Sequence, residues 1–99
     1  MKLREIAHAR TGDKGNLSCI SVIVYDIKHY PLIEAHVTAG RVAEWFTGVV
    51  AGQVTRYELS QLGALNFVLT EALGGGVTRS LALDAHGKCL GQALLDMDI

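Results

Sequence analysis

The sequence predicts a single α+β domain in which a mainly antiparallel sheet carries helices on one face. One observation is a strong strand, LSCISVIVYD from Leu17 to Asp26, which is rich in β-branched residues. The others are two stretches with helical periodicity and several shorter alternating stretches that favour strands. With 99 residues, of which 49% are hydrophobic, the chain can bury about two-thirds of its unfolded surface. We therefore expect one domain over residues 1–99.

Charge and cysteine content argue against several classes of function. The net charge is -1 and the basic residues are scattered, so no basic patch suggests a nucleic-acid or membrane partner. Cys19 and Cys89 are too few for a disulfide scaffold and lack the paired spacing of a zinc site. Arg4 and Glu5 stand where a signal peptide would have its apolar run. We expect a cytoplasmic protein with no metal and no cofactor.

The first quarter of the chain predicts an edge strand, a turn and a central strand. Lys2 to Ala9 is short and β-like, and Thr11 to Asn16 consists of turn-forming residues. The strand from Leu17 to Asp26 is apolar at both even- and odd-numbered positions, and so on both of its faces. A strand buried on one face would not need this. A second layer or another subunit should therefore cover its far face. The two sets are Ile20, Val22 and Val24, and Leu17, Cys19, Ile23 and Tyr25.

Two short helices are predicted next. Pro31 can begin a helix that runs to about Val37, because proline in the first turn loses no helical hydrogen bond. Thr38 then resembles an N-cap for a second helix that ends near Gly48. The residues expected to anchor the core here are Trp45 and Phe46.

The second half predicts a strand from Gln53 to Ser60, then an amphipathic helix that begins near Ala64 and ends at a C-cap, Gly74. Its apolar face would comprise Leu65, Val68, Leu69, Ala72 and Leu73. A strand from Val77 to Asp84 follows, and then a short turn or helix with a closing strand from Cys89 to Ile99. The core order β-α-β-β-α-β is that of a two-layer, ferredoxin-like sandwich. Because one sheet face would stay open, we expect a homo-oligomer or a partner subunit.

Two glycine-bearing stretches are candidate binding elements. Gly74 to Gly76 follow the predicted helix, whereas phosphate loops precede one. They serve either as a cap or as backbone that a ligand approaches closely. Thr11 to Asn16 is either a solvated turn or half of an anion site. The candidate ligand-binding residues are Arg10, Gly12, Asp13, Lys14, Gly15, Asn66, Gly74, Gly75, Gly76, Thr78 and Arg79.

No catalytic signature stands out. Asp13, flanked by glycines and a lysine, is the best candidate for a general base. Four serines lie outside any nucleophile-elbow context. The histidines, His8, His29, His36 and His86, show no metal-ligand spacing.

Two motifs together resemble a known family. ARTGDKGN from Ala9 to Asn16 and ALNFVLTEALGGGVTRSLALDAHGK from Ala64 to Lys88 are similar to the C-terminal ferredoxin-fold domain of the acyclic terpene utilisation (AtuA) proteins. The resemblance implies a link to catabolism of terpenoid or branched acyl-CoA compounds. In that family the domain usually follows a much larger N-terminal domain, so we expect a stand-alone small subunit here. The matching positions are Gly12, Asp13, Lys14, Gly15, Asn66, Gly74, Gly75, Gly76, Thr78 and Arg79.

Two functional hypotheses follow. In the first, the chain is a non-catalytic interaction module that self-associates or docks on a larger AtuA-type partner through its sheet. In the second, Arg10, Lys14 and Arg79 bind a carboxylate or the phosphates of a CoA ester, and Asp13 moves a proton.

Overall fold

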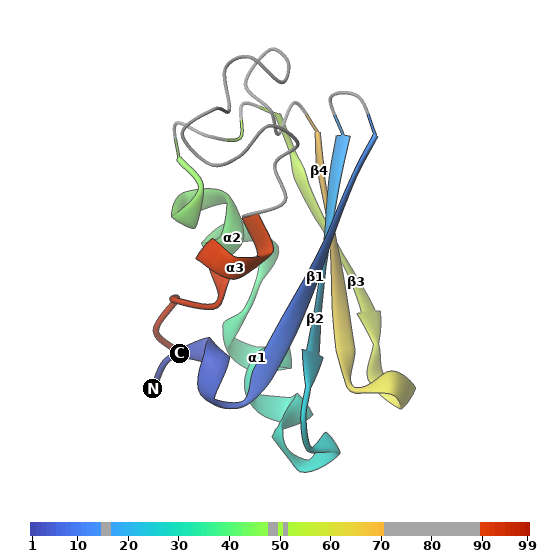
Figure 1. The fold of residues 1–99 in the computed structure, drawn as a ribbon, viewed down its shortest axis with the longest axis vertical. Helices are drawn as coiled ribbons and strands as arrows, with labels where there is room; N and C mark the ends of the chain where they lie inside the picture. Colours follow the sequence, from blue (N-terminus) through green and yellow to red (C-terminus); the bar gives the residue numbers. More distant parts are fainter. Residues whose placement is uncertain (15–16, 48–49, 51, 71–89) are drawn as a thin grey trace.

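The described part of the chain is centred on a four-stranded antiparallel sheet, with strands in the order β1, β2, β4, β3. The computed structural model describes residues 1–14, 17–47, 50, 52–70 and 90–99, and gives only the backbone of residues 13 and 14. The helices lie on one side of the sheet (Figure 1). The predicted α+β class is confirmed. The strands are β1 (Ala7–Lys14), β2 (Leu17–Val24), β3 (Val54–Leu59) and β4 (Ala64–Thr70), and the helices are α1 (Tyr30–His36), α2 (Ala39–Trp45) and α3 (Leu90–Leu94).

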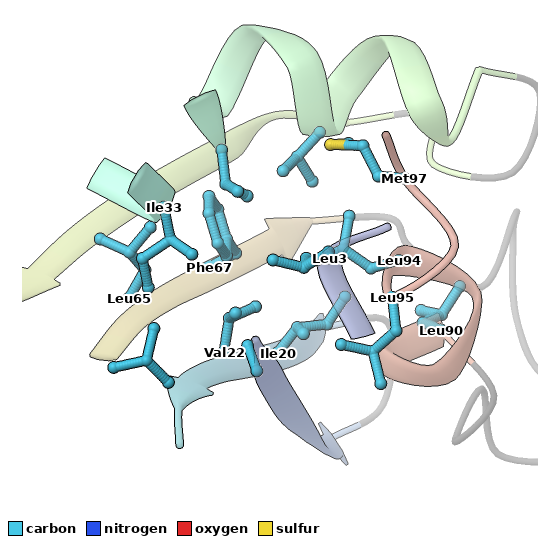
Figure 2. Packing of buried hydrophobic residues seen from close by; sticks show 14 of the residues in the cluster. Leu3, Ile20, Val22, Ile33, Leu65, Phe67, Leu90, Leu94, Leu95 and Met97 are labelled. Atoms are coloured by element: carbon cyan, nitrogen blue, oxygen red, sulfur yellow. The ribbon is translucent and has the colours of Figure 1, made fainter. Parts of the chain in front are cut away.

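The core lies between the helices and one face of the two central strands. Along β2 the side chains alternate between buried and half-buried, and the buried set pairs with the buried set of β4, for example Ile20 with Phe67 and Val22 with Leu65. Ile33 of α1 packs beside Leu65 and Phe67 (Figure 2). The central position predicted for the Leu17 strand is therefore confirmed.

Local signals placed the first two helices correctly. Proline occupies the first turn of α1, and Thr38 Oγ1 accepts a hydrogen bond from the Arg41 backbone N–H at 3.2 Å at the start of α2. Phe46 is buried, as expected. Trp45 is not a core anchor, because it is 41% exposed and its indole N–H donates to the Ala93 carbonyl at 3.0 Å. That hydrogen bond holds the indole at the surface.

The helix predicted from Ala64 is wrong, because this segment is the central strand β4. Leu65, Phe67 and Leu69 are fully buried, whereas Asn66 and Val68 are half-buried, and this is the two-residue period of a strand. β2 pairs along one side of β4 and β3 along the other. The proposed C-cap Gly74 and the strand predicted from Val77 to Asp84 lie outside the described residues.

The N-terminal boundaries also differ from the prediction. The chain begins with a 3-10 turn, Leu3–Glu5, and β1 starts at Ala7 and continues to Lys14. Most of the stretch predicted as a turn, Thr11 to Asn16, is therefore strand. The reason is the pairing with β2, in which Thr11 lies opposite Ile20 and Lys14 opposite Leu17. Among the described strands, β1 is at the edge of the sheet, as expected.

The two ends of the chain lie side by side (Figure 1). The Leu3 N–H donates to the Met97 carbonyl at 2.9 Å, and Arg4 forms an ion pair with Asp96 at 2.7 Å. The short helix predicted after Cys89 is present as α3, but the predicted closing strand is only an isolated bridge between Lys2 and Asp98. No helix in the described part of the chain is long and apolar enough to cross a membrane.

Contact between α3 and β1 depends on Gly91. Its backbone N–H donates to Thr11 Oγ1 at 2.9 Å, and a Cβ at Gly91 would overlap that oxygen. We expect Gly91→Ala to lower the free energy of unfolding by about 1–2 kcal/mol, because Thr11 must rotate away and the hydrogen bond is lost. Urea unfolding measures the change.

Gly40 in α2 is the matched control, because a Cβ there meets nothing within 4 Å. Gly40→Ala should leave stability unchanged or raise it by up to about 1 kcal/mol through helix propensity. Equal effects of the two substitutions would contradict the α3 packing described here.

Candidate functional site

The face of the sheet opposite the helices is the candidate functional surface, and we call it the open face. Side chains alternate between faces along a strand, and cross-strand partners share a face. The register therefore aligns three rows of side chains on the open face. They are Gly12, Cys19, Val68 and Thr55; Arg10, Ser21, Asn66 and Tyr57; and His8, Ile23, Ala64 and Leu59.

The middle row, called here the polar row, crosses all four strands. Asn66 Nδ2 donates to Ser21 Oγ at 2.8 Å, and both side chains are half-buried. Arg10 and Tyr57 stand at the two ends of the row and are exposed. The row thus offers a guanidinium, a phenol hydroxyl and an ordered amide to a ligand or a partner.

Large exposed apolar side chains gather at one end of the sheet, where β2 ends and β3 turns into β4. A Cβ at Gly63 would meet both Ile27 Cδ1 and Val24 Cγ2, so this turn lies against the segment that follows β2. We call the group the end patch. It comprises Tyr25, Ile27, Leu59 and Leu62, with exposed fractions of 68%, 59%, 41% and 70%.

His8 borders the end patch. Its ring stacks on Tyr25, with centroids 5.3 Å apart and planes inclined at 26°. The contact holds the Tyr25 ring beside β1 although Tyr25 is largely exposed. Such a ring presents rigid apolar area at small entropic cost, as is common at protein interfaces.

The candidate residues on the described strands are only partly brought together. Arg10, Gly12 and Asn66 all occupy the open face, with Ser21 between Arg10 and Asn66. Asn66 is on a strand, not on the predicted helix. The backbone of Asp13 lies opposite Ser18 and that of Lys14 opposite Leu17, at the end of β1. Gly15, Gly74, Gly75, Gly76, Thr78 and Arg79 lie outside the described residues.

The sequence reasoning missed Ser21, Tyr57 and the end patch. The signal for Tyr57 and Ser21 is the two-residue alternation in β3 and β2, which assigns odd-numbered positions to the open face once the register is known. The end patch joins residues 25–27 to residues 59–62, and no local pattern links them. Within the described ranges, no three His, Cys, Asp or Glu side chains come together as metal ligands would.

The family model of the AtuA ferredoxin-like domain matches residues 1–99. The chain belongs to this family. The resemblance noted in the two glycine-bearing motifs is thereby confirmed. Neither the curated proteins nor the solved structures include a match to this AtuA ferredoxin-like domain.

On the helix side of the sheet, Arg56 connects β3 to α1. Its guanidinium donates to the carbonyls of Glu34 at 2.7 Å and Val37 at 3.0 Å, and to Glu58 Oε2 at 3.3 Å. A cation suits the C-terminal end of a helix, where carbonyl groups lack partners. Arg56 therefore contributes to the fold of this AtuA ferredoxin-like domain.

Tyr30, at the start of α1, is 7% exposed, and its hydroxyl has no hydrogen-bond partner among the described residues. Burial, and then the negative charges of Glu34 and Glu58, raise the pKa of Tyr30 above its ordinary value. The folded state therefore holds the phenol proton more tightly than the unfolded chain. This stabilising contribution is complete below about pH 10 and is lost as pH rises through the raised pKa.

We expect Tyr30→Phe to leave the free energy of unfolding at neutral pH unchanged or raise it by up to about 1 kcal/mol, because the unpaired hydroxyl is removed. The loss of stability as pH rises above about 10 should become smaller. Urea titrations across this range measure both effects. Tyr25→Phe, which removes an exposed hydroxyl, is the control, and an identical pH profile for wild type and Tyr30→Phe would contradict the assignment.

Proposed function

We propose that this domain is a protein-interaction module that docks on a larger AtuA-type partner through the end patch and the adjoining open face. The observation that carries the proposal is the end patch, in which four large apolar side chains are between 41% and 70% exposed at one end of the sheet. Contiguous exposed apolar surface on a small domain is typical of an interaction site. Ile23, which is half-buried, extends this surface onto the open face.

The open face also differs from an ordinary solvated sheet face. Antiparallel sheets that face water usually carry polar side chains there. On β2 the side chains on the open face are those of Leu17, Cys19, Ser21 and Ile23, and Ser21 is the polar one. Together with the polar row, this composition matches an interface that combines apolar surface with oriented hydrogen-bonding groups.

Family membership supports a partner of the AtuA type, and it supports placing the module in the catabolism of terpenoid or branched acyl-CoA compounds. The family implies that the ferredoxin-like domain accompanies a much larger one. Docking through the end patch would reproduce that association between separate chains.

Leu62→Asp tests the docking surface. Leu62 is 70% exposed in the turn between β3 and β4, so its replacement should leave the fold intact. Burying a leucine contributes about 1.5–3 kcal/mol, so the substitution should weaken binding roughly 10- to 100-fold. Calorimetry with a larger AtuA-type domain, expressed as a separate chain, measures the affinity.

Gln61→Asp is the matched control, because it introduces the same charge at the neighbouring exposed position. It should bind nearly as well as the wild type. Independent elution of the two wild-type proteins at high micromolar concentration would contradict the docking proposal, and so would equal affinities for the two variants.

A second candidate function is binding of an anion such as a CoA ester. Arg10 favours it, because this exposed guanidinium begins the polar row that contains Ser21 and Asn66. Arginine offers paired donors to carboxylate or phosphate. In this proposal Lys14 and Arg79 add further positive charge, and Asp13 remains the proposed proton carrier.

Thermal unfolding in the presence of acyl-CoA esters tests this candidate. A ligand at 100 times its dissociation constant should raise the free energy of unfolding by about 2.7 kcal/mol. The effect should fall in Arg10→Ala, Lys14→Ala and Arg79→Ala, and persist in Lys28→Ala, whose lysine pairs with Asp26. The candidate fails if no ester shifts the unfolding temperature, or if Lys28→Ala loses the shift equally.

A further inference from the structure

Among the described strands, β3 is the last of the sheet and pairs only with β4. The Thr70 N–H donates to the Gln53 carbonyl at 3.0 Å, and the Gln53 N–H donates to Thr70 Oγ1 at 2.7 Å, so the polar backbone groups of Gln53 face β4. These groups alternate in direction along a strand. Those of Thr55 and Tyr57 therefore also face β4. The N–H and carbonyl groups that point to the outer edge belong to Val54, Arg56 and Glu58.

The side chains of this edge offer little protection against pairing with another strand. Native edges are commonly blocked by proline, by bulges or by charge, especially lysine. The segment Val54–Leu59 contains no proline or lysine, and its two charges are opposite and two positions apart. Arg56 and Glu58 lie on the same face, with their charged groups 3.3 Å apart. Such an arrangement is self-complementary when the strand meets an inverted copy of itself.

We infer that β3 pairs antiparallel with β3 of a second copy of this chain, about a two-fold axis at Tyr57. The alternation of the backbone requires the even-numbered positions of the two copies to form the hydrogen-bonded pairs. An axis at Arg56 would place Arg56 opposite the partner's Arg56. An axis at Glu58 would place the two Glu58 carboxylates opposite each other, and an axis at Thr55 would pair neither charge.

An axis at Tyr57 alone places Arg56 opposite the partner's Glu58, and by symmetry it does so twice. Opposite charges across strands stabilise pairing, whereas like charges destabilise it. Arg56 has the capacity for this contact, because a guanidinium has five N–H donors and three hydrogen bonds to described residues use them. Charge complementarity therefore specifies both the occupant and the register.

The same register brings the two Tyr57 side chains together on the open face and places Thr55 opposite the partner's Leu59. Tyr57 is 53% exposed and Leu59 is 41% exposed, so the pairing covers apolar surface as well. The contact is isologous and closed, and it joins the two sheets into one. It covers Leu59 of the end patch, whereas the test of the proposed function rests on Leu62 in the turn between β3 and β4, so either proposal can fail without the other.

Disulfide trapping tests the register. Both native cysteines are first replaced by serine, so that Tyr57→Cys supplies the only thiol. At the axis, non-hydrogen-bonded residues have Cα atoms about 4.5 Å apart, within the range that a disulfide spans. Mild oxidation should convert most of the Tyr57→Cys protein to a covalent dimer.

Thr55→Cys in the same background is the control. The two Thr55 positions lie four residues apart along the paired strands, about 13 Å, and should not cross-link. A mixture of Thr55→Cys and Leu59→Cys proteins should give the mixed dimer, because these positions face each other. Equal cross-linking of Tyr57→Cys and Thr55→Cys would overturn the register.

Sedimentation equilibrium tests the association itself. Glu58→Arg places an arginine opposite the partner's Arg56 at two symmetric sites, and should raise the dimer dissociation constant by about tenfold or more. Glu44→Arg makes the same charge change on the exposed surface of α2 and should leave the constant nearly unchanged. Circular dichroism checks that both variants are folded. The inference is overturned if the wild-type protein stays monomeric at high micromolar concentration, as it would if another segment or protein occupied this edge. Equal effects of the two charge variants would also overturn it.

Discussion

The pairing of β2 with β4 is the contact on which the rest of the structure depends. It joins two hairpins, β1 with β2 and β3 with β4, that would otherwise be separate two-stranded units, which are marginal in water. Ile20, Val22, Leu65 and Phe67 meet across this seam and are fully buried. The helices cover this face, so the seam also determines which face of the sheet remains open.

A second set of contacts holds both chain ends against this core. The backbone hydrogen bond from Leu3 to Met97 and the Arg4–Asp96 ion pair join the ends. Exposed ion pairs contribute little by themselves. The buried side chains of Leu3, Leu94 and Met97 therefore account for most of the stabilisation of the joined chain ends. They hold α3 against β1 and β2.

The two surfaces proposed for interaction follow from the strand order. Among the described strands β3 is the last of the sheet, so its outer backbone groups face away from β4. All described helices lie on one side, so the opposite side presents the polar row and the end patch. The docking site and the edge pairing share Leu59, whereas Tyr25, Ile27 and Leu62 belong to other segments. A dimer through β3 would present two copies of these three residues to larger partners, a route to avidity without new contacts.

Sequence by itself determined the elements whose signals are local. The β-branched run of β2, the proline in α1 and the Thr38 cap each act within a few residues, and all three are confirmed. The paired glycine-bearing motifs gave the family. Tertiary structure decided β4. The apolar residues from Leu65 to Leu73 fit a helical period, and pairing with both β2 and β3 was needed to make Ala64–Thr70 a strand. It also decided the polar row and the end patch, since these join strands whose register no local pattern specifies.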